Sequence, residues 1–241
     1  MRMAGLSDVG RVRARNEDAA DWDERAGVAM VADGMGGHPA GDVASNLAVR
    51  TVMDAVRGAS AMDHWLASGG DPSAALEAAN AAVLEDARRH PERHGMGTTG
   101  VVAALHDGRC RIAHVGDSRA YQLKDGMLKQ LTRDHTAAQQ ALDQQLITPE
   151  QARHTPERHQ LTRALGLDPT VQADIHDTTY ERGDLFLLCS DGLTEMLDDD
   201  PIRDALAENS RDPDAACRLL VRLALDHGGV DNVTVVVVVA S

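Results

Sequence analysis

Two aspartates of this chain stand in the same setting, at the end of an apolar run and directly before a glycine. Asp33 follows residues 28–32, which are all small or apolar, and Asp191 follows the apolar run 185–189 and one serine. Such a run predicts a short buried strand, and glycine lets the backbone approach a ligand closely. A carboxylate at a strand end is therefore a candidate oxygen ligand for a cation, although a tight turn explains Asp33 alone equally well.

Asp231 adds a third carboxylate beside an apolar run, because it stands just before residues 233–239. With Asp33 and Asp191 it offers oxygen ligands without His or Cys, which suits Mg²⁺ or Mn²⁺ better than Zn²⁺. Two such ions, about 3.5–4 Å apart, can share a bridging water and clamp a phosphate. The repeated pattern favours this chemistry over three unrelated turns.

Four further candidates lie in segments whose ordinary interpretation is structural. Arg13 could offer a guanidinium fork to an oxyanion, with Asp18 nearby, but the same residues also fit a charged surface turn. Asp117 lies in Gly-Asp-Ser, which is common in turns. Glu195 follows Asp191 by one helical turn, so both carboxylates could face one site.

The elements that must position these residues include several short strands. Asp-Gly pairs at 107–108 and 125–126 suit the primed turns of hairpins and therefore predict antiparallel pairing. Strands are expected over residues 28–32, 99–105, 111–115, 120–123, 185–189 and 233–239.

Helical periodicity separates some of these strands. Apolar stripes predict helices over residues 41–57 and 73–89 and around 216–223. Helices clustered in this way, together with hairpins, indicate an α+β fold rather than a parallel βαβ wind. The polar segment 133–165 carries only short helical pieces, one of them opened by a capping box at 148–151, and is interpreted as a flap. With no repeat and no linker, we expect a single domain over residues 1–241.

Composition argues against several classes of partner. The formal net charge is −14 and aromatic residues make up 2% of the chain. We therefore expect no nucleic-acid partner and no anionic membrane surface. The three cysteines form no C-x-x-C pair, which argues against disulfides and a structural zinc site. Without a signal sequence or an apolar run that could span a membrane, a cytoplasmic protein is expected.

Eight motifs lie along nearly the whole chain in one order. They are Arg13-x-x-Asn16-Glu17-Asp18, Asp33-Gly34-Met35-Gly36-Gly37-His38, Gly95-Met96-Gly97-Thr98-Thr99, Val115-Gly116-Asp117-Ser118-Arg119, Asp134-His135, Leu161-Thr162-Arg163-Ala164-Leu165-Gly166, Ser190-Asp191-Gly192-Leu193 and Asp231-Asn232. In this order they resemble the metal-dependent serine/threonine protein phosphatases of type 2C, bacterial branch. The resemblance implies a four-layer α-β-β-α sandwich, with two antiparallel sheets face to face and helices outside each.

The resemblance also implies a binuclear metal centre. Asp33 would bridge two Mn²⁺ or Mg²⁺ ions, with the Gly34 carbonyl on one of them. Asp191 and Asp231 would bind the other ion. Asp18 would act through metal-bound water.

Further roles follow from the same resemblance. Arg13 matches the phosphate-binding arginine. Asp117, with Asp191 and with Glu195 as a further candidate, matches a third and weaker metal site of bacterial members. Residues 133–165 match the flap that influences substrate access.

Met35 marks one departure from some family members. Those members, chiefly eukaryotic, have histidine at this position, where it is proposed to protonate the leaving group. Methionine has no proton to donate. The bacterial branch commonly has methionine here, so activity is still expected. A metal-bound water near Asp117 is the best candidate for the acid, while His38 and His135 receive no catalytic role.

The function expected from these motifs is hydrolysis of phosphoserine and phosphothreonine in proteins. A metal-bridging hydroxide would be the nucleophile, and the enzyme would reverse the action of a bacterial serine/threonine kinase. One alternative is a regulatory module on the same fold that binds phosphoproteins with little turnover. Another is a structural protein that binds cations and has no affinity for phosphate. A monomer is the default expectation.

Overall fold

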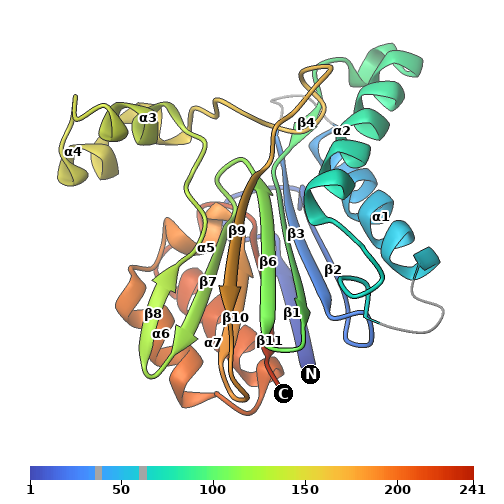
Figure 1. Ribbon diagram of the computed structural model, residues 1–241. Coiled ribbons are helices and arrows are strands. Elements are labelled where there is room, and N and C mark those ends of the chain that lie inside the picture. Colours follow the sequence, from blue (N-terminus) through green and yellow to red (C-terminus); the bar gives the residue numbers. More distant parts are fainter. Residues whose placement is uncertain (36–39, 60–63) are drawn as a thin grey trace.

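The computed structural model describes residues 1–35, 40–59 and 64–241, and its strands form two antiparallel sheets (Figure 1). The first sheet has the order β1-β11-β10-β7-β8, with bounds Arg2–Asp8, Val233–Val239, Leu185–Cys189, Arg119–Lys124 and Met127–Gln130. The second has the order β2-β3-β5-β6-β9, with bounds Asp18–Asp23, Val28–Met35, Gly100–His106, Arg109–Val115 and Asp174–Thr179. A short strand, β4 (Gly97–Thr98), also pairs with β3.

Both predicted hairpin turns are present. Asp107 and Gly108 connect β5 to β6, and Asp125 and Gly126 connect β7 to β8. All four residues have positive φ, between 46° and 76°, which is the backbone of a type I′ turn. Asp-Gly accepts this conformation with little strain, so the local sequence sets the register of both hairpins.

Alternating side chains build the core in layers. Ala29 and Val31 of β3 face the other sheet, where they belong to the same buried cluster as Phe186 and Val236. The intervening residue, Met30, faces outward into a cluster beneath the helices. In this way β3 contributes to two layers of apolar packing, as a strand buried on both faces does.

Helices cover the outer face of each sheet. The second sheet is covered by α1 (Gly41–Ala59) and α2 (Pro72–Arg89), and the first by α6 (Asp199–Glu208) and α7 (Pro213–Asp226). Figure 1 shows both helical layers outside the paired sheets. The predicted α+β sandwich with four layers is therefore confirmed. No helix within the described ranges is long and apolar enough to cross a membrane.

The polar segment 133–165 leaves the sheets as predicted. It holds α3 (Ala137–Asp143), α4 (Pro149–His154) and the 3₁₀ helix η2 (Pro156–His159), and α3 and α4 lie to one side of the sandwich in Figure 1. The capping box at Thr148 is formed with Gln151. A bridge between Thr136 and Leu161 brings the two ends of this segment together, so its tip can lie away from its root. Segment 133–165 is called the flap below.

Candidate metal centre

Carboxylates from distant parts of the chain gather at one end of the two sheets. Asp33 lies near the end of β3, directly opposite Asp18, the first residue of β2. Asp191 follows β10 and opens the short helix α5 (Asp191–Thr194). Asp117 lies in the turn between β6 and β7, and Asp231 precedes β11. The strand-end pattern of the sequence therefore corresponds to one place in the fold.

Burial and mutual repulsion shift the pKa values of these carboxylates. Burial raises the pKa of Asp33 well above its ordinary value, and the charges of Asp18, Asp191 and Asp117 raise it further. Burial likewise raises the pKa of Asp18 to about 6, against hydrogen bonds from Thr234 and Ser190 that lower it. A cluster of buried acids is costly unless a cation or a proton neutralises it.

Unpartnered oxygens show that these residues fit a divalent cation. Oδ1 of Asp18 and Oδ1 of Asp191 are both buried and have no hydrogen-bond partner. Buried polar atoms are normally satisfied, and an ion is one of the few groups that can satisfy several carboxylates at once. Because these donors are oxygens, the set suits Mg²⁺ or Mn²⁺.

The backbone of Asp33 is fixed by its neighbour strand. Its N–H donates to Thr99 Oγ1 at 2.9 Å, and its carbonyl accepts from the Thr99 N–H at 2.8 Å and from Thr98 Oγ1 at 2.9 Å. Thr99 Oγ1 lies in turn 2.6 Å from Ser118 Oγ, beside Asp117. Sequence analysis gave these threonines no role, since their function is to hold another residue in place.

Gly34 is required at its position by the packing around it. A Cβ atom there would overlap with the carbonyl of Gly41 at the start of α1 and would lie 2.6 Å from the Glu17 carbonyl oxygen. The structure therefore shows that other backbone segments pack tightly around Gly34. The assignment of its carbonyl as a ligand remains a prediction.

Arg13 lies at the edge of the centre and is paired with Asp231. Its guanidinium donates to Asp231 Oδ2 at 2.6 Å, and the Asn232 N–H donates to Asp231 Oδ1 at 2.8 Å. Both carboxylate oxygens of Asp231 are therefore engaged. This contact also raises the pKa of Arg13.

Asn232 organises the loop that carries Arg13. Its Nδ2 donates to the carbonyls of Val9 and Arg15 at 2.9 Å each, and its Oδ1 accepts from the Glu17 N–H at 2.8 Å. These three bonds connect residues that are more than 200 positions apart in the chain. The Asp-Asn motif was visible in the sequence, but this role of its asparagine was not.

Glu195 and Asp191 do face one region, as the helical spacing predicted. Within residues 1–35, 40–59 and 64–241, one group of three metal-ligating side chains has its ligand atoms all within 4.8 Å of one another: His159, Asp191 and Glu195. Asp117, which was expected to share a site with Glu195, is outside that group. His159 comes from the flap and was missed by sequence analysis, because no local motif marks it.

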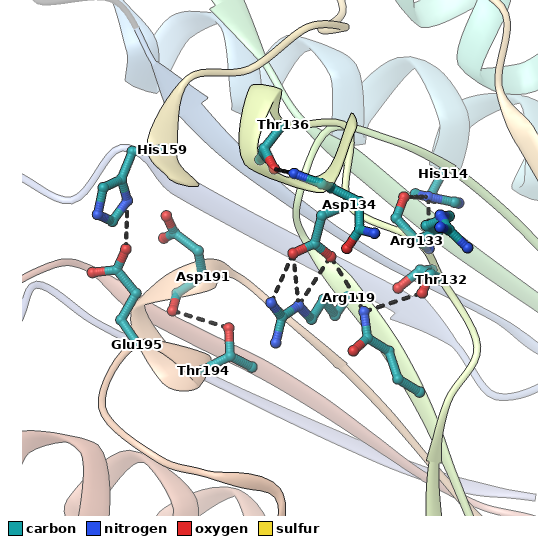
Figure 2. A network of polar contacts seen from close by, with 12 residues as sticks. His114, Arg119, Thr132, Arg133, Asp134, Thr136, His159, Asp191, Thr194 and Glu195 are labelled. Carbon is teal, nitrogen blue, oxygen red and sulfur yellow. Dashed lines mark hydrogen bonds and ion pairs between the residues drawn. The ribbon is translucent and has the colours of Figure 1, made fainter. Parts of the chain in front are cut away.

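The flap root is attached to the sheets by one partly buried ion pair and one buried ring contact. Arg119 donates to both oxygens of Asp134 at 2.7 to 3.2 Å (Figure 2). The rings of His114 and His135 stack with their centroids 4.6 Å apart. His114 also lies 2.8 Å from the carbonyl of Arg133. The first residues of the flap are therefore fixed beside the turn that carries Asp117.

Met35 is the last residue of β3 and pairs with Gly97. The remainder of its motif, residues 36–38, lies outside the described residues. The structure therefore adds nothing about His38.

Comparison with known proteins identifies the family. The family model described as Protein phosphatase 2C matches residues 10–219. The chain belongs to the protein phosphatase 2C family. It is 36% identical over 241 residues to the serine/threonine phosphatase Stp of Listeria welshimeri, which covers 96% of this chain and 93% of the Listeria protein. The predicted family is thereby confirmed, and the Listeria relative is named a serine/threonine phosphatase.

Mycobacterial relatives are similar over the whole of this chain. It is 40% identical over 245 residues to the serine/threonine protein phosphatase PstP of Mycobacterium tuberculosis, covering 98% of this chain but 44% of PstP. The chain thus spans less than half the length of that relative. A crystal structure of the PstP catalytic domain in complex with two manganese ions has a TM-score of 0.85, with 38% identity over 100% of this chain and 98% of that one.

Proposed function

We propose that this phosphatase hydrolyses phosphoserine and phosphothreonine in proteins at a binuclear Mn²⁺ or Mg²⁺ centre built on Asp33. The observation that carries the proposal is the convergence of Asp18, Asp33 and Asp191, with buried oxygens that lack partners. The two manganese ions described for the PstP catalytic domain support the choice of cation.

The ligand roles follow from the position of each residue. Asp33, near the middle of the cluster, would bridge the two ions, with the Gly34 carbonyl beside it. Asp191 and Asp231 would hold the second ion, and Asp18 would act through its water. When bound, the ions would supply a bridging hydroxide as the nucleophile and would neutralise charge on the phosphoryl oxygens.

Ser190 prepares Asp18 for this task. Its hydroxyl donates to Asp18 Oδ2 at 2.8 Å and accepts from the Thr234 N–H at 3.0 Å. One oxygen of Asp18 is therefore fixed, while the other stays free to accept from water. This arrangement orients the carboxylate before substrate arrives, so that less reorganisation is needed during the reaction.

Arg13 would bind the phosphate. It is about half exposed and contacts the centre through Asp231. When Asp231 turns to a cation, the guanidinium loses that partner and can donate two hydrogen bonds to a phosphoryl group. Arg13 would thus orient the phosphate for in-line attack.

Met35 cannot donate a proton, so the leaving alkoxide must be protonated by another group. A water near Asp117 remains our candidate. Burial and the charge of Asp191 raise the pKa of Asp117 well above its ordinary value. A carboxyl with a raised pKa keeps its proton to higher pH, so Asp117 can donate a hydrogen bond to such a water and exchange a proton with it.

The experiment that tests the proposal measures phosphate release from a phosphothreonine peptide with Mn²⁺, with and without a chelator. We expect turnover with Mn²⁺, loss with the chelator, and loss in Asp33→Asn and Asp191→Asn. Asp177→Asn is the matched control. Asp177 is an exposed residue of β9 that pairs with Arg111 of β6 and does not belong to the carboxylate cluster. Full turnover in Asp33→Asn would contradict the two-metal mechanism. Peptide binding without turnover in the wild type would favour the regulatory module instead.

We further propose that the physiological substrates are proteins phosphorylated by a serine/threonine kinase. We also retain a single domain over residues 1–241 and a monomeric state as proposals. Light scattering after size exclusion tests the monomer. Phosphoproteomics of a strain that lacks the phosphatase tests the substrates, since kinase targets should gain phosphate there.

A further inference from the structure

Exposed apolar side chains occur on both loops that meet at Arg13. Within the part of the chain that the structure describes, eight large apolar residues are exposed, and three of them are Val9, Val12 and Val230. Val9 and Val12 lie in the loop after β1, and Val230 lies in the loop before β11. Val12 is 69% exposed and Val230 is 44% exposed. These two residues are called the valine pair below.

Two contacts hold the two loops side by side, one on each side of the valine pair. The Arg11 N–H donates to the carbonyl of Gly229 at 2.7 Å, and the guanidinium of Arg13 donates to Asp231 Oδ2 at 2.6 Å. In each loop, the valine is the single residue between these two contacts. The valine pair therefore lies at one place on the surface, directly beside the arginine that would bind the phosphate.

The backbone that carries the valine pair is firmly held. Gly10 has a φ of 78°, and a Cβ atom there would lie 2.2 Å from the carbonyl oxygen of Asp231 and 2.8 Å from that of Gly229. The Arg11 Nε also donates to the carbonyl of Leu225 at 2.7 Å. A ligand that contacts this surface therefore has little backbone to order, which removes one of the costs of binding.

The position of Arg13 decides what covers the valine pair. Once Arg13 binds the phosphate of a phosphoserine or phosphothreonine, the peptide chain of the substrate must pass over the loop that carries this arginine. Consecutive Cα atoms are about 3.8 Å apart in any chain, and Val12 directly precedes Arg13. The residues next to the phosphorylated one are therefore those that reach the valine pair.

We propose that the valine pair binds an apolar side chain of the substrate, one or two residues away from the phosphorylated serine or threonine. The inference rests on the proposed function, because the phosphate must first be held at Arg13. An apolar side chain gains free energy by leaving water at this surface, whereas a polar one finds no hydrogen-bonding partner on valine. The substrate class is thus a phosphoprotein with a residue such as leucine, isoleucine or methionine beside the modified one.

The discrimination should be modest because the valine pair is exposed and does not form a closed pocket. A hydrophobic pocket distinguishes side chains that differ by one methylene by about 10- to 200-fold. A surface that covers one side of the bound residue should distinguish leucine from serine by roughly threefold to tenfold in kcat/KM. Because this contact forms in the bound substrate as well as in the transition state, the change should appear in KM rather than in kcat.

The test uses phosphothreonine peptides that differ only in having leucine or serine at one of the two positions on either side of the phosphothreonine. With Mn²⁺, we expect the wild type to prefer leucine at one or more of these positions by roughly threefold to tenfold. Val12→Ser should remove the preference. Its kcat/KM for p-nitrophenyl phosphate, which has no flanking residues, should equal that of the wild type.

Met127→Ser is the matched control for the loss of an exposed apolar side chain. Met127 is 74% exposed and opens β8, an edge strand that carries none of the carboxylates of the metal centre. This variant should keep the full leucine preference. Because Val12 is also largely exposed, its replacement leaves the core of the protein unchanged.

Three results would overturn the inference. The first is equal kcat/KM for leucine and serine peptides in the wild type, and the second is a leucine preference that survives in Val12→Ser. The third is an equal loss of kcat/KM on p-nitrophenyl phosphate and on the leucine peptide in Val12→Ser, since Val12 would then act through Arg13. If light scattering shows a dimer that Val12→Ser abolishes, a second copy of the chain covers the valine pair and the inference is also wrong.

The same measurements separate this inference from the proposed function. Turnover of the peptides without a leucine preference would overturn the valine contact and leave the two-metal centre standing. Absence of turnover on every phosphopeptide would overturn the proposed function, and the inference with it.

Discussion

The buried pair His114 and His135 should make folding stability depend on pH in a way that can be measured. Each ring is 3% exposed, and His135 Nδ1 accepts from the Gly116 N–H at 3.1 Å. Burial, together with the charge of the stacked His114, lowers the pKa of His135 from 6.5 to about 4. The opposing contact with Asp174, at 3.4 Å from Nε2, does not outweigh burial.

The sign of the effect follows from linkage. A histidine whose folded pKa lies below its unfolded value contributes stability above pH 6.5, and that stability is lost as the pH falls toward 4. The whole shift corresponds to about 3 kcal/mol. At pH 5 the unfolded chain has gained most of its proton while folded His135 has not, so about 2 kcal/mol is lost relative to pH 7.

The assay is urea unfolding at pH 7, 6 and 5 in the presence of a chelator, with wild type compared to His135→Asn. Asparagine Oδ1 can still accept from Gly116 but has no proton to gain. Carboxylates elsewhere contribute equally to both proteins, so the wild type should lose about 2 kcal/mol more than the variant between pH 7 and pH 5. His154→Asn should follow the wild type. Parallel losses in wild type and His135→Asn would refute the reasoning.

Three other predictions concern the metal centre. Gly34→Ala should destabilise the fold by about 3 kcal/mol in urea unfolding, because its Cβ would overlap with the Gly41 carbonyl; an unchanged midpoint would contradict the packing. Arg13→Ala should lower kcat/KM by roughly tenfold to a hundredfold, with the exposed Arg15→Ala as a control close to wild type. In metal-free protein at pH 8, Asp18→Asn should raise the free energy of unfolding by about 2–3 kcal/mol, since it removes a charge whose pKa is raised to about 6. That gain should shrink below pH 5, while phosphatase activity is abolished.

The sequence predicted the centre of each sheet better than its edges. The bounds predicted for β10 and β11 match the structure, and both strands are buried on both faces. Apart from the two-residue β4, the unpredicted strands are β1, β8, β2 and β9, which are the edge strands of the two sheets. A central strand is a continuous apolar run, whereas an edge strand such as β9, with alternating exposure, resembles a polar loop. Helix α6 was also not predicted.

The candidate site divides in a similar way. Local sequence determined that Asp33 and Asp191 would stand at strand ends beside glycine, because burial and turn chemistry act over a few residues. The order of the eight motifs along the chain then indicated the protein phosphatase 2C family. Only the tertiary structure decided which side chains touch. It paired Arg13 with Asp231 and brought His159 of the flap to Glu195, contacts between segments whose approach no local pattern encodes. Such contacts depend on how two sheets and a flap pack together, and that packing is a property of the whole chain.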